Sequence, residues 1–126
     1  METELSPKEA PTSTITREFL KYTFFKVDPQ WRRLAETERH VAKQEFSTTY
    51  EQASKRILVK SYSLIGIRGE TDFMFWSIST NLEDQQNFVS SLLSTTLGKY
   101  LSTPYSYLAL TRKSEYLAGH QHEGQE

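Results

Sequence analysis

Apolar residues change their spacing several times along the middle of the chain, and each change marks a new element. Segments rich in aromatic and β-branched residues, the pattern of strands, cover residues 17–27, 56–68, 72–79 and 104–111. Apolar residues at helical spacing cover about 29–54 and 82–97. This order predicts an α+β fold of the ferredoxin-like type (β-α-β-β-α-β), in which two helices cover one face of a four-stranded antiparallel sheet.

Short motifs predict where these elements begin and end. Asp28 and Pro29 stop the first strand and predict that a helix begins at once, because aspartate is a good N-cap and proline suits the first helical position. Gly66 predicts a bulge or a close approach within the second strand. The segment Thr80–Glu83 (TNLE) fits a capping box, and Gly98 suits the position after a helix. The apolar side of the first helix is expected to consist of Trp31, Leu34, Val41, Phe46, Tyr50 and Ala53.

Both faces of the predicted sheet are apolar. A sheet face that stays in water should carry polar residues at every second position, and large side chains on both faces exceed what soluble monomers usually expose. We therefore expect a second sheet to pack on the face without helices, supplied by a second copy or by a different polypeptide. The alternative is a single oversized core with the tail folded back over the sheet. The expected interface residues are Tyr22, Phe24, Trp76, Tyr105 and Tyr107.

Composition predicts one soluble domain and argues against several functions. The 126 residues divide into a polar arm (1–14) expected to be disordered, a domain (15–113) and a polar tail or linker (114–126). A net charge of −1 argues against nucleic acid as a partner. The chain has no cysteine, which excludes disulfides and thiolate chemistry. With no apolar run long enough for a membrane span and no secretory signal, we expect a cytoplasmic protein that does not bind membranes.

Four stretches carry a more specific signal. They are Tyr22–Leu34 (YTFFKVDPQWRRL), Lys60–Trp76 (KSYSLIGIRGETDFMFW), Leu93–Leu101 (LSTTLGKYL) and Thr103–Tyr116 (TPYSYLALTRKSEY). In order and spacing they resemble the chlorite dismutase family, which includes the coproheme decarboxylases. The resemblance covers about residues 16–116 and implies a dimeric α/β barrel, in which two ferredoxin-like halves of one chain pack sheet against sheet.

The resemblance is to the N-terminal half alone. It implies that the haem-ligand histidine and the catalytic residues lie in the other half, so no catalytic residue and no haem ligand are assigned to this chain. Haem or coproheme is then expected only in an assembly with a complementing second-half polypeptide. Such an assembly would be a haem-dependent oxidoreductase that decarboxylates coproheme or turns over chlorite or peroxide, with this chain as its structural, oligomerising half. The alternatives are a self-sufficient homodimer that binds a small molecule and a pure interaction module.

The chemical candidates in the chain itself are weak. His40 is expected on the solvated side of the first helix, and His120 and His122 lie in the polar tail, so none is favoured as a metal ligand. Arg68 is a weak candidate for binding a carboxylate of a cofactor, although an ion pair with Asp72 across the hairpin turn is favoured. Two further weak cofactor candidates are Tyr105 and Tyr107, which with Tyr62 and Trp76 could stack on a flat ring but are better explained as interface anchors.

Overall fold

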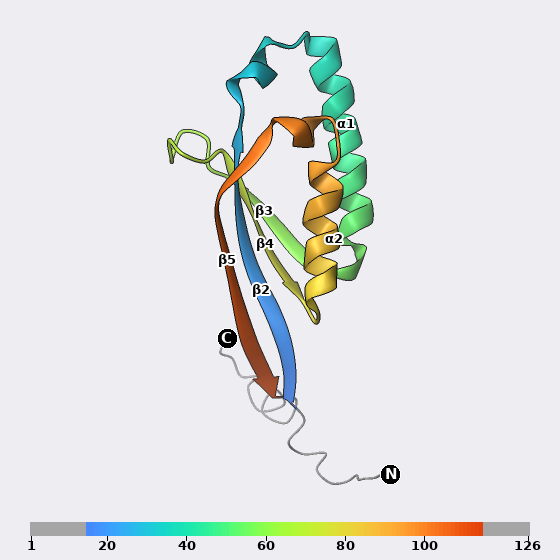
Figure 1. The fold of residues 1–126 in the computed structure, drawn as a ribbon, viewed down its shortest axis with the longest axis vertical. Coiled ribbons are helices and arrows are strands. Elements are labelled where there is room, and N and C mark those ends of the chain that lie inside the picture. The colour runs from blue at the N-terminus through green and yellow to red at the C-terminus, as the bar shows by residue number, and fades with distance from the viewer. Residues whose placement is uncertain (1–14, 115–126) are drawn as a thin grey trace.

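The computed structural model describes residues 15–114, and the predicted arm and nearly all of the tail lie outside this range. The helices and strands are β2 (Ile15–Val27), α1 (Glu36–Ala53), β3 (Leu58–Ser63), β4 (Phe73–Ser79), α2 (Leu82–Leu93) and β5 (Leu101–Ser114). The strands form one antiparallel sheet in the order β3-β4-β2-β5, and both helices lie on the same face of it (Figure 1). This is the predicted ferredoxin-like α+β fold.

The core lies between the helices and the sheet. Phe25 of β2 and Phe75 of β4 contribute the central rings, 5.3 Å apart at their centroids, and Phe88 of α2 packs 5.6 Å from Phe75. One polar contact is buried in this layer, where the Ser77 hydroxyl donates to the Gln85 side-chain oxygen at 2.8 Å. The helix-covered face therefore accounts for Phe25 and Phe75, with Phe73 and Val59 packed beside them.

The first helix begins later than predicted. Asp28 does cap a helical turn, since its side chain accepts a hydrogen bond from Gln30 N, but that turn is a short 3-10 helix, Pro29–Arg33. The α-helix starts only at Glu36, so Trp31 and Leu34 belong to the connection. The predicted apolar side was also wrong at one position: Val41 is 67% exposed, and its neighbour Ala42 is buried instead.

The second strand is shorter than predicted. It ends at Ser63, and residues 64–72 form the loop to β4. Gly66 adopts φ +82° in this loop with no atom near its missing side chain, so it serves a turn and neither a bulge nor a close approach.

The second helix differs from the prediction at both ends. Its N-cap is Asn81, whose side chain accepts from Asp84 N, in place of the predicted Thr80–Glu83 box. It ends at Leu93, and Gly98 lies buried in a following 3-10 turn, Leu97–Tyr100. Between residues 15 and 114, neither helix combines the length and the apolar character needed to cross a lipid bilayer.

Candidate functional site

The face of the sheet that the helices leave uncovered is the candidate site. Strand register aligns its side chains in three rows of four, each row running across β3, β4, β2 and β5. Ten of these twelve side chains are aliphatic or aromatic, one is Met74 and one is Lys60. We call this surface the open face: Tyr62, Met74, Phe24 and Tyr105; Lys60, Trp76, Tyr22 and Tyr107; Leu58, Ile78, Leu20 and Ala109.

Aromatic contacts connect the strands across this face. Phe24 lies edge-on to both Tyr105 and Tyr107, with ring centroids 6.3 and 6.1 Å away. The Lys60 ammonium lies 5.9 Å from the centre of the Trp76 ring, within the range of a cation–π contact. Side chains on adjacent strands therefore already contact these rings in the single chain, without a partner sheet.

Much of the open face remains in contact with water. Leu58, Tyr62 and Tyr107 expose 56%, 48% and 57% of their surface, and nothing between residues 15 and 114 covers them. The five residues predicted at an interface (Tyr22, Phe24, Trp76, Tyr105 and Tyr107) all lie on this face. Their placement is as predicted, and their role at an interface stays a prediction.

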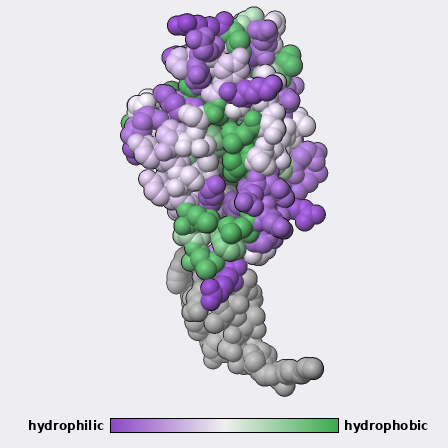
Figure 2. Space-filling view, viewed as in Figure 1, coloured by the Kyte–Doolittle hydropathy of each residue, from purple (hydrophilic) through white to green (hydrophobic). Residues whose placement is uncertain are grey.

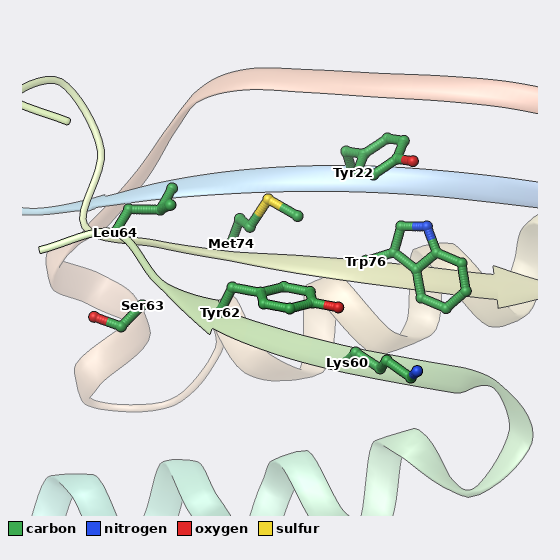
Figure 3. A pocket seen from close by; sticks show the side chains of 7 residues that line it. All are labelled: Tyr22, Lys60, Tyr62, Ser63, Leu64, Met74 and Trp76. Carbon is green, nitrogen blue, oxygen red and sulfur yellow. The ribbon is translucent and has the colours of Figure 1, made fainter. Parts of the chain in front are cut away.

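The β3 side of the open face contains a shallow hollow of about 530 Å³. Figure 3 shows Tyr22, Tyr62, Met74 and Trp76 side by side on three adjacent strands, with the helices behind the sheet. Lys60 brings an ammonium group to its rim. The hollow could therefore hold a flat, apolar group with a negative charge at one end.

The loop between β3 and β4 pairs its charges differently from the prediction. Arg68 binds Glu70 at 2.7 Å, and the predicted Arg68–Asp72 pair is absent. Asp72 instead accepts a hydrogen bond from Val27 N at 2.8 Å and lies 3.7 Å from the Lys26 ammonium. Arg68 pairs with Glu70 because residues 64–72 form a loop, so no regular hairpin places Arg68 opposite Asp72.

Hydrogen bonding between Arg68 and Glu70 raises the pKa of the arginine and lowers the pKa of the glutamate. The charges of Tyr105 and Tyr107 contribute weakly to the pKa shift at Arg68.

Among residues 15–114 the open face carries no histidine, which is the haem-iron ligand that the family resemblance implies. Haem iron takes its axial ligand from His, Cys, Met or Tyr, and the family resemblance implies a histidine. Within residues 15–114 one histidine occurs, His40, which is exposed on α1 with its ring 3.5 Å from the Gln44 amide, away from the open face. The described chain also holds no group of three metal-binding side chains. His120 and His122 lie outside the described residues.

Sequence reasoning missed the parts of the site that depend on register. Lys60 and Leu58 belong to the open face because β3 pairs with β4 so that Lys60 opposes Trp76 and Leu58 opposes Ile78. Alternation along β3 was the available signal, since Leu58, Lys60 and Tyr62 share one side of the strand. The contact of Lys60 with Trp76 needs the pairing itself.

Comparisons with known proteins agree with one another. The family model described as Chlorite dismutase matches residues 39–126. A coproheme decarboxylase of Mycolicibacterium smegmatis is 31% identical over 114 residues, which are 89% of this chain and 48% of that protein. A mutant chlorite dismutase of Candidatus Nitrospira defluvii superposes with a TM-score of 0.73 at 31% identity, over 81% of this chain and 43% of the other.

A haem-binding protein from Thermus thermophilus superposes with a TM-score of 0.68 at 14% identity, over 82% of this chain and 44% of the other, and shows a shared fold. The chain thus spans about half the length of the relatives it matches.

Proposed function

Because the chain belongs to the chlorite dismutase family, we propose that its open face packs against a second sheet of the same type in a haem protein of this family. The observation that carries the proposal is the open face, with three rows of largely apolar side chains that nothing between residues 15 and 114 covers. The length of the match supports the proposal. This chain covers about half of each relative, and the remaining half of those proteins is long enough to form a second sheet of the same type.

Burial of the open face contributes a favourable free energy to such packing. Covering a few hundred Å² of apolar surface at about 25 cal/mol per Å² contributes several kcal/mol. Two sheets packed face to face lie about 10 Å apart with their side chains interdigitated. The half-exposed rings of Tyr62 and Tyr107 are placed to fill that layer.

In this proposal the chain is the structural half of the assembly. Its contribution is to cover the second sheet, exclude water from the layer between them and build the oligomer. No imidazole from residues 15–114 reaches the open face. The haem ligand, and with it the decarboxylation of coproheme or the turnover of chlorite or peroxide, is therefore assigned to the second sheet's half.

Self-association of the purified chain tests this role, because a second copy then supplies the partner sheet. Trp76→Glu puts a charge at the centre of the open face, and Val41→Glu puts the same charge on an exposed apolar position of α1 as the matched control. Sedimentation equilibrium is expected to show weaker association for Trp76→Glu and unchanged association for Val41→Glu. Equal behaviour of the two variants, or no association of the parent chain at any concentration, would contradict the proposal.

The hollow on the open face favours a second candidate, a homodimer that encloses a small molecule. Its volume of about 530 Å³ lies within the common range of ligand sites, roughly 300–1,000 Å³. An anionic aromatic dye is the simplest probe, since Lys60 lies at the rim beside Trp76. This candidate predicts that Lys60→Met weakens dye binding while leaving self-association intact, and a dye that binds both chains equally would argue against it.

A further inference from the structure

Of the twelve side chains of the open face, Lys60 alone is charged, and it lies in the middle row. The pairing of β3 with β4 sets Lys60 opposite Trp76, and its ammonium lies 5.9 Å from the centre of the Trp76 ring. Figure 3 shows the two side chains on the same side of the sheet, on neighbouring strands. The ammonium is therefore turned toward the interior of the open face and not away from the outer edge of β3.

No carboxylate between residues 15 and 114 is placed to pair with this ammonium. None of the open-face side chains is acidic, and within the described residues Lys60 forms no ion pair. Along β2 and β4 the closest acidic residues are Glu18 and Asp72. Each lies four residues from the row of Lys60, which corresponds to about 14 Å along a strand. Asp72 is in addition held by Val27 N and by the Lys26 ammonium.

Packing of a sheet on the open face would take the Lys60 ammonium out of water. Burial of an ammonium group is unfavourable unless a negative charge pairs with it, because apolar neighbours do not replace its hydration. The contact with Trp76 compensates for part of this loss, and the hydroxyls of Tyr22 and Tyr62 beside the hollow can accept hydrogen bonds. Neither contact balances the charge, so the counter-charge has to come from the covering sheet.

We propose that the sheet covering the open face carries an aspartate or glutamate side chain that pairs with Lys60. This inference rests on the function proposed above, because it concerns the sheet that packs there. The hollow beside Lys60, with a volume of about 530 Å³, has room for such a side chain. Its carbon atoms would pack against the rings of Tyr62 and Trp76, and its carboxylate would lie beside the ammonium.

The same lysine makes a second copy of this chain the weaker partner. Two open faces packed together bring two Lys60 ammonium groups into one layer, and their own side chains add no carboxylate. Like charges repel more strongly in such a layer than in water. An unpaired charge of this kind discriminates against the wrong partner. Lys60 therefore favours a different, acidic sheet, and self-association is weaker than the apolar area alone would give.

Removal of the charge tests the role of Lys60 in self-association. Lys60→Met keeps an unbranched side chain of similar length, and Lys43→Met removes the same charge from an exposed position of α1. Figure 2 shows mostly hydrophilic side chains on the right of the view, where α1 lies in Figure 1. Sedimentation equilibrium is expected to show at least roughly tenfold tighter self-association for Lys60→Met and a change below about threefold for Lys43→Met. The homodimer that encloses a small molecule predicts no change for either variant.

A mixture of opposite charges tests the carboxylate itself. Lys60→Glu supplies a sheet of the same shape that carries a carboxylate in place of the ammonium. In an equimolar mixture with the parent chain, the mixed pair holds one charge of each sign, whereas each chain alone pairs like with like. The mixed pair is expected to associate at least roughly tenfold more tightly than either chain alone. An equimolar mixture of the parent with Lys43→Glu is the matched control and is expected to show no such gain.

The outcomes separate this inference from the function on which it rests. If Lys60→Met associates no more tightly than Lys43→Met, or the mixture no more tightly than its components, the acidic partner is wrong although two sheets still pack. If no variant and no mixture associates, the inference and the proposed function both fail. Urea unfolding of each dilute variant checks that the fold is intact, and Lys60→Gln, which also removes the charge, replaces Lys60→Met if that variant does not fold.

Discussion

Truncation of Tyr62 to alanine is expected to weaken assembly much more than its place on the sheet surface suggests. Tyr62 lies in the first row of the open face beside Met74 and exposes 48% of its surface. A tyrosine side chain buries on the order of 200 Å² when fully covered. The part that a partner sheet would newly cover is therefore about 100 Å², which at about 25 cal/mol per Å² corresponds to roughly 2.5 kcal/mol.

The phenol hydroxyl reduces this gain, so we expect Tyr62→Ala to weaken association by about 2 kcal/mol for each copy, or about 4 kcal/mol and roughly 1,000-fold in the dissociation constant of a dimer in which both chains carry the substitution. The covered half of the ring contributes separately to the fold itself. Sedimentation equilibrium measures the first effect, and urea unfolding of dilute, dissociated chain measures the second. The two must be measured apart, because a destabilised fold also lowers apparent association.

Val41→Ala is the control, since Val41 is 67% exposed on α1 and removed from the open face. It is expected to change the dissociation constant by less than about threefold. The reasoning is refuted if Tyr62→Ala and Val41→Ala have the same small effect on association. It is also refuted if Tyr62→Ala acts on fold stability alone.

Three further outcomes follow from the described geometry. Gly98→Ala would make a Cβ clash with the backbone of Leu92 and Leu93, so a loss of about 2–3 kcal/mol in the free energy of unfolding is expected in urea titrations. An unchanged midpoint would contradict the packing of this turn. A hydrogen bond from the Thr96 backbone lowers the pKa of Glu45, so this carboxylate stabilises the fold above its unfolded pKa of about 4.3 and loses that effect as the pH falls through the folded value. Glu45→Gln should therefore make acid unfolding below about pH 5 less steep, and identical acid limbs would count against the contact. Haemin added to the purified chain is expected to give no one-to-one ligated Soret band, and a ligated band that disappears in His40→Ala would show that the described residues do bind haem iron.

The fold could be predicted because its signals are local and repeated. Each strand carries aromatic or β-branched residues, and the apolar spacing changes at each boundary, so the order of six elements follows without knowledge of contacts. The boundaries were less predictable, since several residues could cap each helix. Asn81, and not Thr80, caps α2, and the helix predicted to start at Pro29 begins with a separate 3-10 turn.

The position of the site on one face of the sheet was predictable from the sequence, but its individual contacts were not. Alternation along β2 is enough to place Tyr22 and Phe24 on one face, because successive residues of a strand point to opposite sides. That Trp76 lies on the same face follows from the pairing of β2 with β4. The ion pairs of the β3–β4 loop were not predictable, because they depend on where β3 stops. Because β3 ends at Ser63, Arg68 lies in the loop and forms its ion pair with Glu70.

The fluorescence of Trp76 gives the most direct test of whether the open face is covered. The chain has two tryptophans, and Trp31→Phe leaves Trp76 as the sole indole. Acrylamide quenching of this variant, followed from dilute to concentrated chain, is expected to weaken steeply as the chain associates and a second sheet shields the indole. Quenching that stays strong at every concentration, with a sedimentation mass fixed at 14.7 kDa, would contradict the account.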